Sequence, residues 1–241
     1  EFARTPSMPE PEPDGRLRIG FLSAFFRRHS VARLYSGWFE ALDRRRFRTF
    51  AYQTDARTDR VTDLIAGQCD AFRRFDAGKD TPLDDYPAQF EAIARAVAAD
   101  RLHALVFTDL GMDTLTFALA ALRLAPVQAT GLGHPVTTGF PSIDYFLSGD
   151  MVERDDAQKH YSETLVRLPN ISFRLYDPGA TGRARTRPRS YFGFQSGDVV
   201  FLAAQSVFKY LPHYDRIFPA IAKAVPAARF CVRIPMFKNY N

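Results

Sequence analysis

The chain has 241 residues, of which 46% are hydrophobic and 24% are charged, as in an ordinary globular protein. This length predicts about one and a half domains, and the composition excludes disorder of the chain as a whole. Because it contains no run of about 18 apolar residues, the sequence given also excludes a transmembrane helix.

The net charge is +5 and 27 of the 32 basic residues are arginine, which leaves only five lysines. The arginines are scattered and have no interleaved aromatic stripe, which favours a solvated basic surface over nucleic-acid binding. Cys69 and Cys231 lie far apart without metal-type spacing, and we interpret them as reduced thiols of a cytoplasmic protein.

Short apolar or alternating runs predict strands, and apolar residues at helical spacing predict the helices between them. Strands that alternate with helices indicate βαβ units and a mainly parallel sheet, hence an α/β fold. The expected strands are 17–23, 47–53, 104–108, 127–132, 143–148, 164–168, 199–203 and 228–234, and the expected helices are 31–42, 58–69, 87–99, 114–122 and 212–225.

The composition changes three times along the chain. Residues 1–15, rich in Pro and Glu, predict a disordered arm, and residues 16–176 predict a first α/β lobe. A linker rich in Pro, Gly and Arg follows at 177–189. Residues 190–241 contain one βαβ unit, which is too little to cover both faces of a sheet, so we expect the start of an incomplete second lobe.

Ligands of open α/β sheets bind beyond the carboxyl ends of the strands, so the residues that follow each strand are candidates for the site. His29 follows the first strand, where it can exchange a proton or hydrogen bond in a cleft or simply remain solvated at a helix start. Asp109 follows the strand at 104–108, where it can bind a hydroxyl or serve as a turn residue, and Asp113 is a candidate helix cap.

The loop after the strand at 127–132 carries the densest group of polar residues. Gly133 and Gly139 allow tight turns, and His134, Thr137 and Thr138 offer neutral donors and acceptors close together. That chemistry suits a sugar, whose hydroxyls need several directional hydrogen bonds. A polar loop with no ligand would have the same composition and is the alternative interpretation.

Lys209 follows the strand at 199–203 and precedes the helix expected at 212–225. A lysine ahead of a helix N-terminus predicts an anion site, because the cation and the free N–H groups point the same way. A surface lysine that packs over its aromatic neighbours is the alternative. GxGxxG, Walker-type, HExxH and nucleophile-elbow motifs are all missing from the sequence, as is a metal-type His/Cys/Asp cluster.

Several stretches together resemble the Spindly/O-GlcNAc transferase family, in its order and spacing from about residue 16 to residue 235. The resemblance is closer to bacterial members and extends to the bacterial adhesin N-glycosyltransferases. It rests on RIGFLS at 18–23 with His29, DLGMD at 109–113, LAPVQ at 124–128, GLGHPVTTG at 131–139, SIDY at 142–145, HYSETLVRLP at 160–169 and QSVFK at 205–209.

The resemblance implies a GT-B fold of two Rossmann-like lobes and inverting transfer of GlcNAc or another hexose from a UDP-sugar to a protein side chain. It favours Ser or Thr over Asn as acceptor, and needs no metal or other cofactor. The catalytic residues carried over are His29, near the acceptor, and Asp109 as candidate bases, and Lys209, which would stabilise charge on the departing UDP. The binding residues are Gly133, His134, Pro135, Thr137 and Thr138 in the sugar and acceptor pocket, and Gln205, Ser206 and Lys209 on the donor.

Three alternatives to a working transferase stay open at this stage. Because the Gly- and Thr-rich donor stretch of the family is missing, we expect this chain to be inactive by itself or to need self-association or a second chain that completes the donor lobe. A non-catalytic module that binds a protein partner is the second, and another GT-B enzyme acting on free nucleotide-sugars, such as an epimerase, is the third. We expect neither nucleic acid nor membrane as a partner.

Overall fold

The structure is a computed structural model that describes residues 2–76, 85–174, 186–206 and 209–232. The chain divides into two compact units, 1–180 and 181–241, which are described separately. Most of the linker predicted at 177–189 and the end of the last predicted strand lie outside the described residues.

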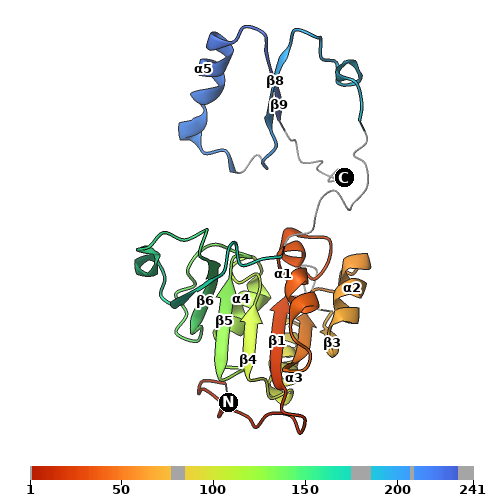
Figure 1. Ribbon diagram of the computed structural model, residues 1–241, viewed down its shortest axis with the longest axis vertical. Coiled ribbons are helices and arrows are strands. Elements are labelled where there is room, and N and C mark those ends of the chain that lie inside the picture. Colours follow the sequence, from red (N-terminus) through yellow and green to blue (C-terminus); the bar gives the residue numbers. More distant parts are fainter. Residues whose placement is uncertain (1, 77–84, 175–185, 207–208, 233–241) are drawn as a thin grey trace. The chain divides into compact units, whose positions relative to one another are not determined.

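The first unit is built on a seven-stranded sheet in the order β3-β2-β1-β4-β5-β6-β7, and every neighbouring pair is parallel (Figure 1). The α/β fold with a parallel sheet predicted from the sequence is therefore confirmed. The strands are β1 (Leu17–Ser23), β2 (Phe47–Gln53), β3 (Ala71–Arg74), β4 (Ala104–Phe107), β5 (Val127–Gly131), β6 (Tyr145–Gly149) and β7 (Thr164–Leu168).

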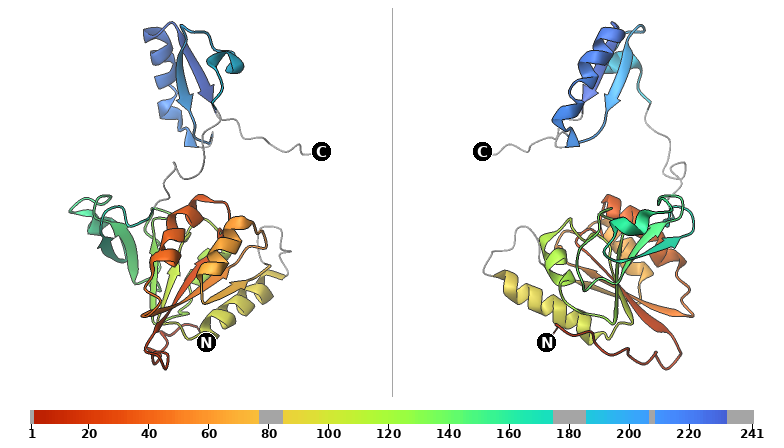
Figure 2. Two further views of the ribbon diagram at one scale, coloured as in Figure 1. Left: turned by 45° about the vertical axis from the view of Figure 1, so that its right-hand side comes forward. Right: turned by 90° about the vertical axis from the view of Figure 1, so that its left-hand side faces the viewer.

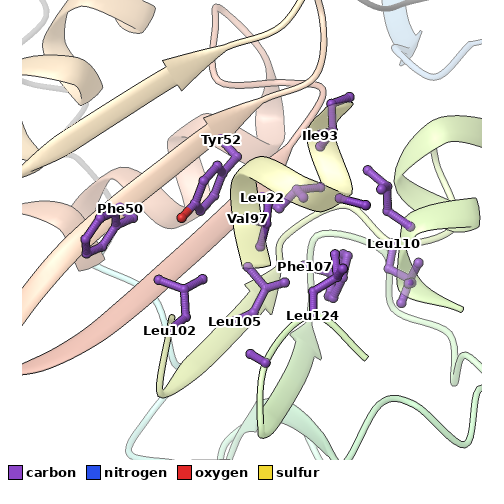
Figure 3. Packing of buried hydrophobic residues seen from close by; sticks show 14 of the residues in the cluster. Leu22, Phe50, Tyr52, Ile93, Val97, Leu102, Leu105, Phe107, Leu110 and Leu124 are labelled. Carbon is purple, nitrogen blue, oxygen red and sulfur yellow. The ribbon is translucent and has the colours of Figure 1, made fainter. Parts of the chain in front are cut away.

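Four helices cover the two faces of this sheet (Figure 2). They are α1 (Ser30–Ala41), α2 (Arg60–Gln68), α3 (Tyr86–Ala99) and α4 (Thr114–Ala120). Buried side chains of α1 and α2, such as Phe39 and Ile65, pack on Phe21 and Ala51 from one face. Those of α3 and α4 pack on the other face, where Leu22, Leu105 and Phe107 meet Ile93 and Val97 (Figure 3).

Local capping explains where several helices begin. Asp59 caps α2 through a reciprocal capping box with Thr62, and Asp113 caps α4 by accepting a hydrogen bond from the Thr116 amide at 2.9 Å. The helix-cap role expected for Asp113 is therefore confirmed. His29 caps α1, and Pro87 stands in the first turn of α3, where its missing N–H costs nothing.

A buried amide joins the end of α4 to β5 and β6. The Gln128 side chain accepts hydrogen bonds from the amides of Leu124 and Ala125 at 2.8 and 3.2 Å. It also donates to the carbonyls of Leu122 and Ser142, both at 2.9 Å. All four partners satisfy one fully buried side chain, which fixes the chain path into β5 and so the position of the loop that follows it.

Residues 2–15, predicted to be part of a disordered arm, lie against the amino end of the sheet instead. The Phe2 carbonyl accepts from the Arg123 amide at 2.9 Å, and the Phe2 ring packs on the core. Glu12 pairs with Arg18 and Arg48 at 3.2 and 3.0 Å. Arg48 and Arg123 are distant in sequence, so the local composition of the arm does not reveal these contacts.

The second unit pairs β8 (Val199–Ala203) with β9 (Ala228–Val232) in parallel, with α5 (Ile217–Ala224) between them in the chain. Phe218 of α5 contacts Phe230, which in turn stacks on Phe201. The helix expected at 212–225 is shorter than predicted, because Pro212–Tyr214 forms a separate 3-10 turn.

Gly133 marks a close approach between the segments that follow β4 and β5. A Cβ atom at this position would lie 1.6 Å from the Thr108 carbonyl oxygen, so any side chain must displace backbone. Only glycine therefore fits here.

We expect Gly133→Ala to lower the free energy of unfolding of the first unit by about 3 kcal/mol or more, because backbone rather than a flexible side chain must move. The measurement is urea unfolding followed by fluorescence of Trp38, the single tryptophan of the chain. Gly67→Ala is the matched control: it lies in α2 with no heavy atom within 4 Å of the added methyl group. Equal stability of the two variants would contradict the close approach.

Candidate functional site

The candidate site lies at the carboxyl edge of the first sheet, where β1 and β4 are neighbours and the strand order reverses. Helices leave β1 and β4 toward opposite faces, so a crevice opens between the loops that follow them. Segment 24–29 follows β1, segment 108–113 follows β4, and both carry predicted site residues.

Asp109 joins these two loops from inside the protein. Its side chain is fully buried and accepts a hydrogen bond from the Ala24 amide at 3.2 Å and from the Thr108 hydroxyl at 3.2 Å. The predicted carboxylate is therefore at the expected edge of the sheet, but it faces the loop after β1 and not solvent. In this arrangement it can position that loop.

Burial raises the pKa of Asp109 to about 7, which outweighs the hydrogen bonds that it receives and that favour the ionised form. The nearby carboxylate of Asp113 acts in the same direction. Asp109 consequently titrates near neutral pH, unlike an ordinary surface carboxylate.

His29 stands at the N-terminus of α1 with one ring nitrogen occupied. Its Nδ1 accepts from the Val31 amide at 3.3 Å, and its ring stacks on Phe25 at 4.2 Å between centroids. Burial and then the charge of Arg27 lower the pKa of His29, which favours the neutral imidazole. With Nδ1 as acceptor, the proton lies on Nε2, so His29 is a hydrogen-bond donor unless its ring leaves the cap.

His134 lies beside the loop after β4. A Cβ atom at Gly111, which has a φ of +99°, would come within 2.9 Å of His134 Nδ1. Gly131 is the last residue of β5, three residues before His134. A Cβ atom added there would lie 2.6 Å from the hydroxyl oxygen of Tyr35, a residue of α1. The structure thus brings His134 and Asp109 to one edge through their loops, and Tyr35 packs beneath them.

Thr137 and Thr138 make hydrogen bonds within the protein. The Glu163 carboxylate accepts from the Thr137 hydroxyl at 2.8 Å, from the Thr138 amide at 2.7 Å and from the Thr138 hydroxyl. Burial opposes ionisation of Glu163, but these hydrogen bonds prevail and lower its pKa. The ionised Glu163, just before β7, therefore holds the predicted sugar loop in place, while Pro135 is exposed on it.

Gln205, Ser206 and Lys209 lie in the second unit, after β8 as expected. The Lys209 amide donates to the Ser206 carbonyl at 2.9 Å, and both Lys209 and Gln205 are exposed. The α-helix that follows begins only at Ile217, because Pro212–Tyr214, where the helix was expected to begin, forms a 3-10 turn.

Two residues that support the candidate site, Glu163 and Tyr35, were not predicted from the sequence. Glu163 stands directly before a strand and not after one, so a search for residues that follow strands passes over it. Tyr35 looks like an ordinary core residue at helical spacing from Val31 and Phe39, and no local pattern marks its hydroxyl.

Within the described ranges, no group of three or more His, Cys, Asp or Glu residues is placed to hold a metal ion. No helix of this part of the chain is long and apolar enough to cross a membrane.

The raised pKa of Asp109 predicts a pH-dependent stability. A carboxyl whose folded pKa of about 7 exceeds its unfolded value stabilises the fold fully at acidic pH and loses that contribution as the pH rises through 7. Asn at this position keeps the acceptor for Ala24 but does not ionise. Between about pH 4 and pH 8, we expect the free energy of unfolding to fall by up to about 4 kcal/mol with Asp109, and expect no such fall in Asp109→Asn. Urea unfolding of both proteins at a series of pH values measures it, and parallel pH profiles would contradict it.

A similar architecture is found among solved structures. A lysine-to-methionine mutant of the Thermobaculum terrenum O-GlcNAc transferase superposes with a TM-score of 0.73 and 26% sequence identity, covering 94% of this chain and 41% of the other. This similarity extends over both units and confirms the GT-B type of fold expected from the resemblance.

Curated relatives point the same way. The probable UDP-N-acetylglucosamine–peptide N-acetylglucosaminyltransferase SPINDLY of Solanum lycopersicum is 28% identical over 230 residues, which are 93% of this chain and 23% of that protein. The Arabidopsis thaliana protein of the same kind named SEC is 26% identical, over 91% of this chain and 22% of its own length. The chain thus spans about a quarter of these relatives. Residues 4–177 match glycosyl transferase family 41, and the chain belongs to that family.

Proposed function

We propose that this chain forms part of an inverting glycosyltransferase that moves GlcNAc from UDP-GlcNAc to a Ser or Thr hydroxyl of a protein. The observation that carries the proposal is membership of glycosyl transferase family 41, with a structural match over 94% of the chain to an O-GlcNAc transferase. The names of the curated relatives support UDP-GlcNAc as donor and a polypeptide as acceptor.

In this proposal the first unit binds the acceptor. His29 donates Nε2–H to an oxygen of the acceptor or the sugar, and the loop from Gly133 to Thr138 lies against the sugar. Asp109 positions the loop that carries His29, since it binds the Ala24 amide. The geometry supports a positioning role for Asp109 better than direct proton transfer, because its side chain is fully buried.

The second unit in turn binds the donor. Lys209, with Gln205 and Ser206 beside it, contacts the diphosphate and stabilises the negative charge of the departing UDP. Such a preorganised cation acts on charge that develops in the transition state, and removing one group of this kind typically lowers the rate by about 10²–10³. The proposed reaction uses no metal.

Calorimetric titration of UDP into this chain tests the donor site. We expect saturable binding that Lys209→Ala weakens roughly tenfold to a hundredfold, as for the loss of a charged hydrogen-bond partner. Lys223→Ala is the control, because this substitution removes the same charge from the same unit, in the last turn of α5. Absent binding, or an equal effect of the two substitutions, would contradict the proposed donor site in this chain.

A further inference from the structure

Positive charge collects around His29. The β1–α1 and β2–α2 loops, with the first turns of the helices that follow them, contain five arginines and three aspartates. The arginines are Arg27, Arg28, Arg33, Arg57 and Arg60, and the aspartates are Asp55, Asp59 and Asp63.

The aspartates of this region balance part of that charge and leave a net charge of +2. Asp55 is held by Arg57, whose Nε lies 2.9 and 3.0 Å from the two carboxylate oxygens. Asp59 accepts backbone N–H groups, from Arg28 at 2.6 Å and from Val61 at 2.8 Å. Asp63 is exposed one turn along α2 and forms no ion pair among the described residues.

Three of the arginines are exposed and unpaired. For the part of the chain that the structure describes, the guanidinium groups of Arg28, Arg33 and Arg60 have no carboxylate partner. Arg27 is only weakly paired, since its Nη2 lies 3.9 Å from Asp55 and its buried Nε has no hydrogen-bond partner among the residues described. Among the described residues, this guanidinium therefore lacks a close carboxylate to balance its charge.

The backbone holds these arginines beside one another. The hydrogen bond from the Arg28 amide to Asp59 joins the β1–α1 loop to the start of α2, where Arg60 is the first helical residue. Arg33 lies one turn into α1 from His29, and its amide donates to the His29 carbonyl at 3.3 Å. Because the loops are fixed, the backbone loses little conformational freedom when an anion binds, and the cost of ordering falls on the arginine side chains.

We propose that this surface, formed by Arg27, Arg28, Arg33 and Arg60, binds carboxylate side chains of the acceptor polypeptide and so favours acceptors with Asp or Glu near the modified residue. The inference rests on the proposed function in taking His29 to lie beside the acceptor hydroxyl. An acidic polypeptide fits the surface better than the donor diphosphate, because the four arginines belong to one loop and two helices, and an extended chain can meet charges on several segments.

Fluorescence anisotropy with two labelled peptides tests this proposal on the intact chain. One peptide carries a central Ser flanked by Glu residues, and in the other each Glu is replaced by Gln. We expect the acidic peptide to bind more tightly, and the variant with Arg28→Gln, Arg33→Gln and Arg60→Gln to reduce its affinity roughly tenfold, since each exposed pair contributes little. The preference should also weaken as salt is raised.

A charge-matched variant separates this surface from the general basic charge of the chain. Arg4→Gln, Arg45→Gln and Arg101→Gln remove the same charge from exposed positions elsewhere in the first unit and should leave peptide affinity unchanged. Equal losses in the two triple variants, or no preference for the acidic peptide, would overturn the proposal. So would a matching loss of UDP affinity in the first variant, which would assign the arginines to the donor. If UDP binds normally while the acidic peptide shows no preference, the inference fails and the proposed function stands.

Discussion

One buried contact at the point where the strand order reverses determines how the candidate site is built. Asp109 extends from the end of β4 and binds the amide of Ala24 in the loop after β1. That bond crosses the boundary between the two halves of the sheet, whose helices pack on opposite faces. The β5 segment can approach only because Gly133 has no side chain to meet the Thr108 carbonyl. The three loops that hold the first-unit residues therefore depend on two tight contacts with little tolerance for change.

The polar residues of this edge serve first to hold one another. The Thr137 and Thr138 side chains bond to Glu163, and Nδ1 of His29 is occupied by the amide of Val31. The groups left for a ligand include Nε2 of His29, the ring of His134 and backbone groups of the loops. This division is typical of preorganised sites, in which most of the polar groups hold the loops in position and a few contact the ligand.

Much of the fold could be predicted from the sequence, because burial on both faces produces continuous apolar runs such as 17–23 and 104–107. β3 escaped, since its four residues are partly exposed and two of them are arginines. The prediction of disorder for residues 2–15 was wrong, because the arm's partners include Arg48 and Arg123, which are far away in sequence. The candidate site residues were chosen by their position after strands, whereas the burial of Asp109 and the hydrogen bonds of Glu163 arise only from tertiary packing.

Asp59 has two roles at once, since one oxygen caps α2 and the other binds the amide of Arg28. The cap and the loop are therefore thermodynamically coupled through a single side chain. Fraying of α2 removes one of the two contacts that hold the loop bearing His29, and the coupling free energy by which the helix stabilises this loop equals that by which the loop stabilises the helix. The stability of a peripheral helix thus reports on how well the loop that bears His29 is formed, and sequence changes along α2 can act on that loop without touching it.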